Sequence, residues 1–381
     1  MKKSLVTVAC SALILFALTF FTWGSTALAA PTRTTSPASK HSGFVRACAV
    51  VPQGYARCLA LVSTINTNAD PTGGNPPYGP ANLHSAYNLP TNASGTPTVA
   101  VVDAYNNPNL ASDLATYRSM FGLPACTVGS GCLKIVNQTG GSKLPPNNSG
   151  WGLEESLDVD MVSAICQNCH ILLVEGTAPT NGDLGIAVNE AVKLGAIAVS
   201  NSYGESEFSG ENTPCKSYYQ HTDVAITAST GDSGPGVSYP AVCKTIIGVG
   251  GTTLNPNGTE TAWSGAGGGC SAYVLKPKWE SSSVTGCSKR AVADVSADAD
   301  PNTGVYVYDT YGYGGGVQVG GTSVSSPIIA SVFALAGNVS SLKHPAQFIW
   351  KNYSKGCLFK VGSKQYAYQT GLGSPDGTAC F

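Results

Sequence analysis

The sequence contains little charge. Only 11% of its 381 residues are Asp, Glu, Lys or Arg, and the formal net charge at pH 7 is −1. A chain without a basic excess has no electrostatic attraction for nucleic acid or anionic lipid. Beyond residue 23 the sequence also lacks an apolar run long enough to span a membrane, and it has no internal repeat. These absences exclude nucleic-acid-binding proteins, multispanning membrane proteins and repeat proteins.

The amino terminus carries the one long apolar run. Lys2 and Lys3 precede an apolar stretch from about residue 5 to 23, and small residues follow at 25–30. This order is typical of a signal peptide, which we place at residues 1–30. A membrane anchor is the alternative, because the run is just long enough to cross a bilayer. With cleavage, we expect a soluble monomer that is secreted to the extracellular space and has no membrane partner.

The cysteines fit an exported protein. Of the 13 cysteines, Cys10 lies in the predicted signal peptide, which leaves an even set. An even set outside the cell indicates disulfides. Their arrangement favours local bridges, although the sequence alone does not fix the connectivity. The favoured pairs are Cys48–Cys58, Cys126–Cys132, Cys166–Cys169, Cys215–Cys243, Cys270–Cys287 and Cys357–Cys380.

Residues 31–80 differ from the rest of the chain. They are rich in Pro, Thr, Ser, Gly and Asn and have no sustained periodicity, so we interpret them as a short N-terminal extension or pro-region. From 81 to 381, short apolar runs that read as buried strands alternate with helical patterns. The expected strands are 98–103, 170–175, 197–202, 224–229 and 245–249, and the expected helices are 109–121, 153–165, 183–194 and 323–336.

This alternation predicts an α/β fold, a single domain in which a parallel β-sheet is flanked by helices on both faces. In such sheets the functional site forms outside the carboxyl ends of the strands. Residues directly after Asp103, Glu175, Ser202 and Ser229 are therefore the candidates for that edge.

One candidate is a serine at a predicted helix start. The segment Gly320-Gly321-Thr322-Ser323-Val324-Ser325-Ser326-Pro327 precedes a helix of small and apolar residues. The unpaired N–H groups of a helix start stabilise negative charge near such a hydroxyl, as a nucleophile requires. A helix cap is the alternative role, since serine and threonine are common there.

Two carboxyls form a second candidate. Glu154 and Asp158 are four residues apart, so they share one face of the helix predicted from residue 153. Two carboxyls held close together share a proton and titrate as a unit. The alternative is a solvated acidic first turn. By the same geometry, Glu155 and Asp160 lie on other faces and are expected to be surface or supporting groups.

A third candidate follows a predicted buried strand. Asp232 lies in Ser229-Thr230-Gly231-Asp232-Ser233-Gly234. A carboxyl donates a hydrogen bond only while it is protonated, so a site that uses one as a donor works best in acid. A plain turn aspartate is the alternative.

Together these segments resemble the sedolisins, the serine-carboxyl peptidases of subtilisin-like fold, over roughly residues 81 to 381. The resemblance implies that Ser323 is the nucleophile, Glu154 its general base, Asp158 the residue that orients Glu154, and Asp232 the oxyanion donor. None of the five histidines stands in the His-Gly-Thr-His setting of subtilisin-like enzymes, so we do not expect a His-based triad. The implied function is hydrolysis of peptide bonds in proteins or peptides at acidic pH, by an endopeptidase.

The resemblance extends to supporting residues. Ser202, Tyr203 and Gly204 match the end of the family's substrate-pairing strand, where backbone hydrogen bonds hold an extended peptide. Asp103 stands where subtilisin-like enzymes carry their catalytic Asp, and we expect it to be a supporting acid. Trp151 is expected either to line the cleft or to pack.

The sequence departs from the family pattern in two places. Only about fifty residues separate the predicted signal peptide from the expected domain, so we do not expect the family's long prosegment. The family's calcium loop has an Asp at each end, and Lys360 and Ala367 stand at the matching positions. We therefore predict no calcium and no other cofactor. An inactive relative that keeps the fold as a binding protein is the alternative.

An alternative interpretation, as a haem protein, rests on Cys166-Gln167-Asn168-Cys169-His170, which fits the c-type haem attachment pattern. Haem attachment and a disulfide would both leave an even number of other cysteines, so the cysteine count does not decide between them. Because His170 opens a predicted buried strand, we favour a disulfide between Cys166 and Cys169.

Overall fold

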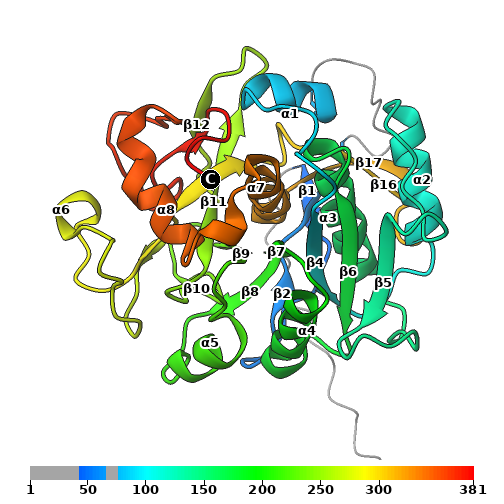
Figure 1. Cartoon of the computed structure of the whole chain (residues 1–381), viewed down its shortest axis with the longest axis horizontal. Coiled ribbons are helices and arrows are strands. Elements are labelled where there is room, and N and C mark those ends of the chain that lie inside the picture. The colour runs from blue at the N-terminus through cyan, green and yellow to red at the C-terminus, as the bar shows by residue number, and fades with distance from the viewer. Residues whose placement is uncertain (1–42, 66–75) are drawn as a thin grey trace, which may run out of the picture. The chain divides into compact units, whose positions relative to one another are not determined.

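The computed structural model describes residues 43–65 and 76–381, and its centre is the predicted sheet (Figure 1). The strands are β4 (Thr98–Ala104), β5 (Leu133–Asn137), β6 (His170–Gly176), β7 (Ala198–Asn201), β9 (Ala225–Ser229), β11 (Ile247–Leu254), β12 (Glu260–Ala262) and β15 (Val295–Asp298). They are ordered β12-β11-β9-β7-β4-β6-β5, and β15 also pairs with β11. All these pairs are parallel except β11 with β12. The predicted α/β architecture is confirmed.

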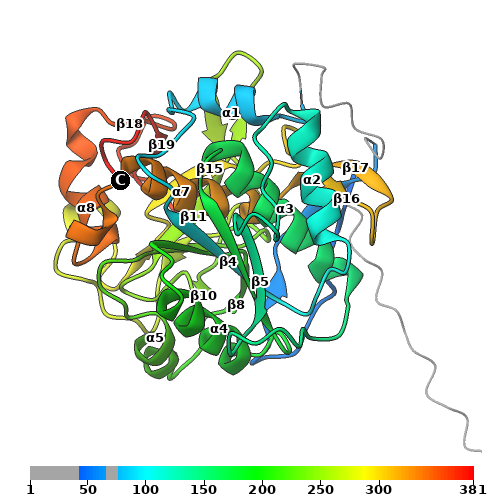
Figure 2. The ribbon, with the colours of Figure 1, turned by 45° about the vertical axis from the view of Figure 1, so that its right-hand side comes forward.

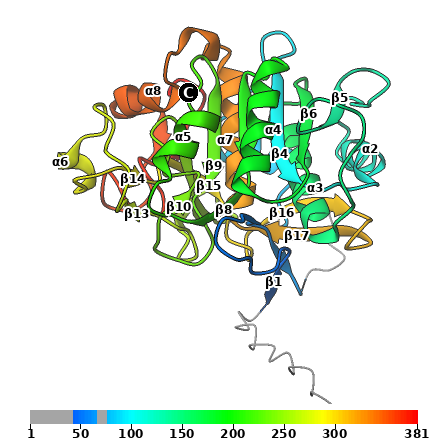
Figure 3. The same cartoon turned by 90° about the horizontal axis from the view of Figure 1, so that it is seen from below.

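Helices cover both faces of the sheet. They are α1 (Pro80–Ala86), α2 (Leu110–Met120), α3 (Ser149–Ile165), α4 (Asn181–Lys193), α5 (Asn212–Tyr218), α6 (Ser282–Thr285), α7 (Thr322–Ala336) and α8 (Pro345–Asn352), with short 3₁₀ turns at Val339–Ser341 and Tyr353–Lys355. Alternate residues of β4 point to opposite faces. Val99 and Val101 pack in the core with α3 and α7, whereas Ala100 and Val102 pack in the core with α4 and α5. Figure 2 shows α2 and α3 side by side, and Figure 3 looks onto α4 and α5.

Most predicted boundaries agree with the structure to within two residues, but α3 begins four residues before the predicted start. The Asn148 side chain accepts hydrogen bonds from the N–H groups of Gly150 and Trp151, at 3.0 and 3.1 Å. This cap satisfies two donors of the first turn. It allows the glycine-containing stretch before residue 153 to be helical.

Smaller sheets join the N-terminal segment to the rest of the molecule. Their strands are β1 (Phe44–Arg46), β2 (Arg57–Cys58), β3 (Leu61–Ser63), β8 (Tyr203–Ser206), β10 (Ser238–Tyr239), β16 (Val305–Asp309) and β17 (Gly315–Gly320). One sheet has the order β1-β3-β17-β16 and another the order β10-β8-β2. Two further pairs are β13 (Gly269–Cys270) with β14 (Ala291–Val292), and β18 (Leu358–Phe359) with β19 (Ser374–Pro375). Figure 3 shows the blue N-terminal segment beside β8 and β17.

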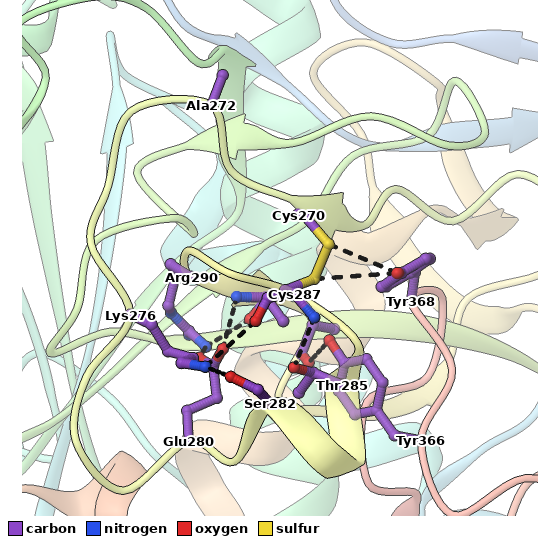
Figure 4. Close-up of a disulfide and its surroundings, with 12 residues drawn as sticks. Cys270, Ala272, Lys276, Glu280, Ser282, Thr285, Cys287, Arg290, Tyr366 and Tyr368 are labelled. Carbon is purple, nitrogen blue, oxygen red and sulfur yellow. Dashed lines mark hydrogen bonds and ion pairs between the residues drawn. A yellow bond between two sulfur atoms is a disulfide. The ribbon is translucent and has the colours of Figure 1, made fainter.

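All six predicted disulfides are present. Because the Cys166 and Cys169 sulfurs are bonded to each other, the structure leaves neither for thioether attachment of haem. Figure 4 shows the Cys270–Cys287 bridge, where the Tyr368 hydroxyl lies 3.5 Å from the Cys270 sulfur.

The predicted signal peptide, residues 1–30, lies outside the described residues. Within the described part of the chain, no helix is both long enough and apolar enough to cross a membrane.

Candidate active site

The carboxyl-bearing helix α3 runs through the core rather than along the surface. Every residue from Trp151 to Ile165 is buried. A helix that is enclosed on all sides must bury whatever polar residues it carries. Glu154 and Asp158 are fully buried, with an exposed fraction of 0% each. The alternative of a solvated acidic turn is therefore wrong.

Glu154 faces the predicted nucleophile. Burial raises the pKa of Glu154 well above its ordinary value, and the nearby Asp158 and Asp103 raise it further. The nearby Ser323 hydroxyl acts in the other direction and lowers the pKa of Glu154. Neither Glu154 oxygen has a hydrogen bond of ordinary length among the described residues. A carboxyl that is buried, close to other acids and adjacent to a hydroxyl has the properties of a general base that shares a proton with its neighbours.

Asp158 and Asp103 complete a group of buried acids that we call the acid cluster: Asp103, Glu154 and Asp158. Asp158 Oδ1 accepts a hydrogen bond of 2.7 Å from the Ser202 hydroxyl, and its Oδ2 has no hydrogen-bond partner among the described residues. Burial, and then Asp103, raise the pKa of Asp158. Asp103 lies one residue before the end of β4. Both of its oxygens are buried and without a partner in the described chain, and burial raises its pKa to about 8.

Ser323 lies in the first turn of α7. Gly321 precedes the helix with φ +100°, a conformation that favours glycine. The Ser323 hydroxyl donates to the Ser202 carbonyl oxygen over 3.1 Å. Ser202 therefore links both partners of the reaction, since its own hydroxyl binds Asp158 and its carbonyl binds Ser323. In the same first turn the Val324 N–H donates to the Gly321 carbonyl over 3.0 Å.

Asp232 reaches the same helix start from the loop after β9. Its Oδ1 accepts hydrogen bonds from the Thr322 N–H at 2.8 Å and the Thr322 hydroxyl at 2.9 Å. Its Oδ2 is buried and has no partner in the described part of the chain. Burial raises the pKa of Asp232 to about 6, while Thr322, Arg46 and Arg57 lower it. At acidic pH the carboxyl is protonated and can donate a hydrogen bond.

The three predicted substrate-binding residues have different surroundings. Ser202 contacts the acid cluster, as described. Tyr203 is buried, and its hydroxyl donates to Asn201 Oδ1 at 2.7 Å, so its side chain points away from the serine site. Gly204 pairs with Arg57 of β2 on one side of β8, and β10 covers the other side. The strand predicted to pair with substrate is therefore already paired with the chain's own N-terminal segment.

Two other acids of α3 differ from expectation. A surface position for Glu155 and Asp160 is wrong, because both are buried. Glu155 accepts from the Asn107 N–H at 2.8 Å and Asp160 from the Tyr308 N–H at 3.0 Å, so each supports a neighbouring loop or strand. Trp151 packs, with 4% of its surface exposed and its ring 6.3 Å from that of Tyr203.

The described histidines have partners elsewhere. His84 binds the carbonyls of Leu89 and Ala164. His221 contacts Asn189 and the Tyr218 carbonyl, His344 stacks on Trp279, and His170 opens β6. None of these contacts involves Ser323, in keeping with a site built on carboxyls.

The loop expected to bind calcium in the family does not fit the ion. Calcium takes several oxygen ligands, chiefly carboxylates. Within residues 360–376 the only carboxyl is Asp376, which accepts a hydrogen bond of 2.7 Å from Asn88. The loss of calcium binding at Lys360 and Ala367 stays a prediction.

Sequence reasoning missed Thr322 and the N-terminal segment. The Thr322 hydroxyl fixes Asp232, and the only available signal was its place before Ser323. Arg46 donates to the Asp232 carbonyl oxygen at 2.9 Å, from a stretch whose composition resembles a linker. The Cys48–Cys58 spacing was the one sign that this stretch is folded.

Comparison with known proteins places this chain in a family of peptidases. The model of the subtilase family matches residues 144–351. Sedolisin of Pseudomonas sp. (strain 101) is 28% identical over 72% of this chain and 52% of its own length. Xanthomonalisin of Xanthomonas sp. (strain T-22) is 27% identical over 68% of this chain and 37% of its own length. A probable tripeptidyl-peptidase, SED2 of Trichophyton verrucosum, is 29% identical over 42% of this chain and 32% of its own length.

A solved structure agrees with these sequence matches. Pseudomonas sedolisin, described as a serine-carboxyl proteinase in complex with two molecules of pseudo-iodotyrostatin, superposes with a TM-score of 0.65. The two proteins are 26% identical, and the match covers 79% of this chain and 96% of that one. This chain spans about half the length, or less, of the curated relatives it matches.

Proposed function

This chain belongs to the subtilase family, on its sedolisin-like branch, and from that premise we propose that it is a secreted serine-carboxyl endopeptidase that hydrolyses peptide bonds in acid. The proposal rests on one observation, which is that three groups meet at the start of one helix. They are the Ser323 hydroxyl, the buried Glu154 carboxyl and the Asp232 oxygen that has no partner among the described residues. Proteins or peptides are the expected substrates, and no cofactor takes part.

The first half of the reaction forms an ester. Ser323 Oγ attacks the carbonyl carbon of the substrate, and Glu154 accepts the hydroxyl proton as the C–O bond forms. The electron pair of the carbonyl bond moves to its oxygen. Before the attack the pair holds one proton, on Asp158, and one charge, on Glu154, since two buried neighbouring carboxyls do not both ionise freely. Transfer of the serine proton to Glu154 leaves the pair neutral.

The oxyanion lies between the start of α7 and Asp232. Protonated Asp232 donates through the oxygen that has no other partner in the described chain. Collapse of the intermediate breaks the C–N bond, and the leaving amine takes the proton from Glu154. Water then hydrolyses the ester by the same steps in reverse. Because the pKa of Asp232 is about 6, we expect activity to fall as the pH rises through about 6.

Substitutions on α7 and α3 test the proposal. Ser323→Ala and Glu154→Gln should abolish cleavage of denatured casein at pH 4, with a loss of kcat on the order of 10⁴ to 10⁶. Ser331→Ala is the matched control, because Ser331 is also buried on α7 and its hydroxyl has no partner among the described residues. Wild-type activity in either site variant would overturn the assignment.

Secretion is supported by the six disulfides, which form and persist in oxidising compartments. N-terminal sequencing of protein recovered from the culture medium tests it, and a chain retained with the cells and still carrying residues 1–30 would contradict it. An inactive binding protein remains the alternative, and the casein measurement separates the two.

A further inference from the structure

We propose that Glu175 is a positioning residue for the reaction: it forms the outer end of a row of hydrogen-bonded, buried carboxyls that stabilises the negative charge of Glu154. This inference rests on the proposed function, because it concerns the basicity of the same site. We call the four acids the carboxyl row: Glu154, Asp158, Asp103 and Glu175.

Glu175 has no partner that would explain it as a part of the fold. It follows the apolar residues 171–174 in β6. Its exposed fraction is 0%, and neither of its carboxyl oxygens has a hydrogen-bond partner among the described residues. Burial of a polar group without a partner costs free energy that an apolar side chain at the same place would not. The packing of β6 therefore gives no reason for an acid here.

The pairing of the strands places Glu175 beside another acid of the site. Strands β4, β6 and β5 lie side by side and run parallel (Figure 1). Glu175 of β6 pairs in register with Asp103 of β4. Neighbouring strands are about 4.8 Å apart, and paired residues of parallel strands point to the same face of the sheet. The carboxyls of Glu175 and Asp103 are therefore neighbours.

Both carboxyls face the helix that carries the proposed base. Ile171 and Leu173 of β6 pack in one core with Leu157 of α3, whereas Leu172 packs in the core on the side of α4. Because alternate residues of a strand share a face, Glu175 points to the same side as Ile171 and Leu173, toward α3.

Asp103 connects Glu175 to the catalytic pair. Burial, and then Asp103, raise the pKa of Glu175 to about 8. Burial, and then Asp103, also raise the pKa of Asp158, so Asp103 lies close to both acids. Asp158 has one oxygen, and Asp103 and Glu154 have two each, without a hydrogen-bond partner in the described chain. Oxygens free to share protons are thus present at every step from Glu154 to Glu175.

The other groups on this face do not satisfy Glu175. Glu155 of α3 lies near it, since burial, then Glu175 and Asp103, raise the pKa of Glu155. Glu155 Oε2 accepts from the Asn107 N–H at 2.8 Å, which ties it to a loop. On β5, Asn137 pairs in register with Glu175, but its side-chain amide is engaged in its own loop. Asp103 is the neighbour that remains for Glu175.

The charged groups of the surrounding elements are also engaged or face away. Asp309, near Glu155, accepts hydrogen bonds from two N–H groups of its own turn. Lys134 of β5 pairs with Leu172 and points with it to the opposite face. Helix α4 packs on that face too, and its charged residues are Asp183, Glu190 and Lys193. Among the described residues, no Lys or Arg forms an ion pair with Glu175.

The carboxyl row acts in its protonated form. A neutral carboxyl donates one hydrogen bond and accepts others, whereas two neighbouring carboxylates repel each other. With protons on Glu175, Asp103 and Asp158, the hydrogen bonds run in one direction toward Glu154, and each strengthens the next. The row therefore stabilises one negative charge on Glu154. That charge is neutralised when the proton of Ser323 arrives.

Loss of the outer donor should weaken this stabilisation. The charged form of Glu154 then becomes less favourable, so the pKa of Glu154 rises and less of the base is ionised at a given acidic pH. The acid limb of kcat/KM, which reports ionisation of the base, moves to higher pH. The limb near pH 6 that we assign to Asp232 stays in place. KM stays unchanged, because Glu175 is buried behind the site and touches no substrate.

The test compares variants of Glu175 in pH profiles of kcat and KM for a fluorogenic peptide. Glu175→Met has a similar length and no donor, and we expect its acid limb to move up by about one pH unit, which is about tenfold in activity on the acidic side. Glu175→Gln keeps a donor in its amide and should retain the wild-type limb. Asp160→Asn is the matched control, because it neutralises a buried acid of α3 that holds the Tyr308 N–H outside the row, and its profile should not change.

A double variant separates a positioning role from a structural one and covers the possibility that Glu175→Met misfolds. Asp103→Leu with Glu175→Met replaces two neighbouring buried acids by apolar side chains, which is neutral or stabilising for a fold. We expect a midpoint of urea unfolding at or above that of the wild type. Its acid limb should lie no higher than in Asp103→Leu alone, because Glu175 acts through Asp103.

Three results would overturn this inference and leave the proposed function standing. They are an acid limb in Glu175→Met that coincides with that of the wild type, a shift in Glu175→Gln as large as in Glu175→Met, and a double variant that unfolds more easily than the wild type. Absence of peptide hydrolysis by the wild type at every pH would overturn the proposed function, and this inference with it.

Discussion

Two groups of buried acids in this molecule are neutralised in different ways. The acid cluster, Asp103, Glu154 and Asp158, has no Lys or Arg in an ion pair with it among the described residues. Some distance along the chain, Glu280 and Asp294 both contact the buried Arg290. Figure 4 shows Arg290 beside Glu280, where the distance between Nη1 and Oε2 is 2.9 Å.

The difference separates a supporting group from a reactive one. Asp294 also accepts from the Trp350 indole N–H at 2.7 Å and the Gly248 N–H at 2.7 Å, so its charge is fully compensated. In the acid cluster compensation comes from protons, because burial raises the pKa of each carboxyl. A group that exchanges its proton is useful for catalysis, whereas a group locked to an arginine stabilises the fold.

The sharpest way to separate the two groups is to neutralise one acid in each. Glu154→Gln should lower kcat for peptide hydrolysis by about 10⁴ or more, because the general base is lost. Glu280→Gln should leave kcat of the folded enzyme within about twofold. Equal losses of kcat in the two variants would contradict the division between catalytic and supporting acids.

The free energy of unfolding should respond in the opposite sense, with the larger loss in Glu280→Gln and the smaller in Glu154→Gln. Glu280→Gln leaves Arg290 with one buried carboxylate instead of two, and loss of one member of a buried ionic group costs about 3–5 kcal/mol of unfolding free energy. Glu154→Gln should cost far less at pH 7, since it removes a poorly compensated acid. Denaturant unfolding of both variants measures the difference, and a larger loss for Glu154→Gln would break the comparison.

The acid cluster should also give stability an unusual pH dependence. The folded pKa of Asp103, about 8, is above its unfolded value near 4, so its contribution is fully present below about pH 4 and is lost as the pH rises through about 8. The slope is up to about 1.4 kcal/mol per pH unit for each such group. Asp103→Asn should flatten the decline between pH 4 and 8. Glu190, which is paired with Lys193, offers a control in Glu190→Gln, which should not flatten the decline.

A smaller effect is expected at Asp232. Asp232→Asn replaces a donor that exists only in acid with an amide that donates at every pH. The fall in kcat/KM that we expect for the wild type near pH 6 should then move to higher pH, even if the maximum is lower. A variant whose profile keeps its limb near pH 6 would show that another group sets it.

Local sequence patterns predicted the sheet well, and they also indicated the residues of the proposed site. β4 and β6 are continuous apolar runs, and Ser323, Glu154 and Asp232 each lie in a short segment whose spacing is itself informative. The six disulfides also follow neighbouring cysteines along the chain.

The predictions that failed concern features that depend on contacts between residues far apart in the sequence. Strands β2 and β3 are two and three residues long and pair with β8 and β17, which lie more than a hundred residues further along, so the composition of the N-terminal segment reads as a linker. For Glu155 and Asp160 both a surface and a supporting position were expected, because helix geometry gives the direction of these side chains but not what covers them. Their partners, Asn107 and Tyr308, come from other elements.

The pH profile of kcat/KM for a fluorogenic peptide tests the carboxyl-activated serine most directly. The account predicts activity in acid that declines as the pH rises through about 6, where Asp232 loses its proton, and no activity in Ser323→Ala. Activity that rises between pH 6 and 8, as a histidine base would give, would contradict it.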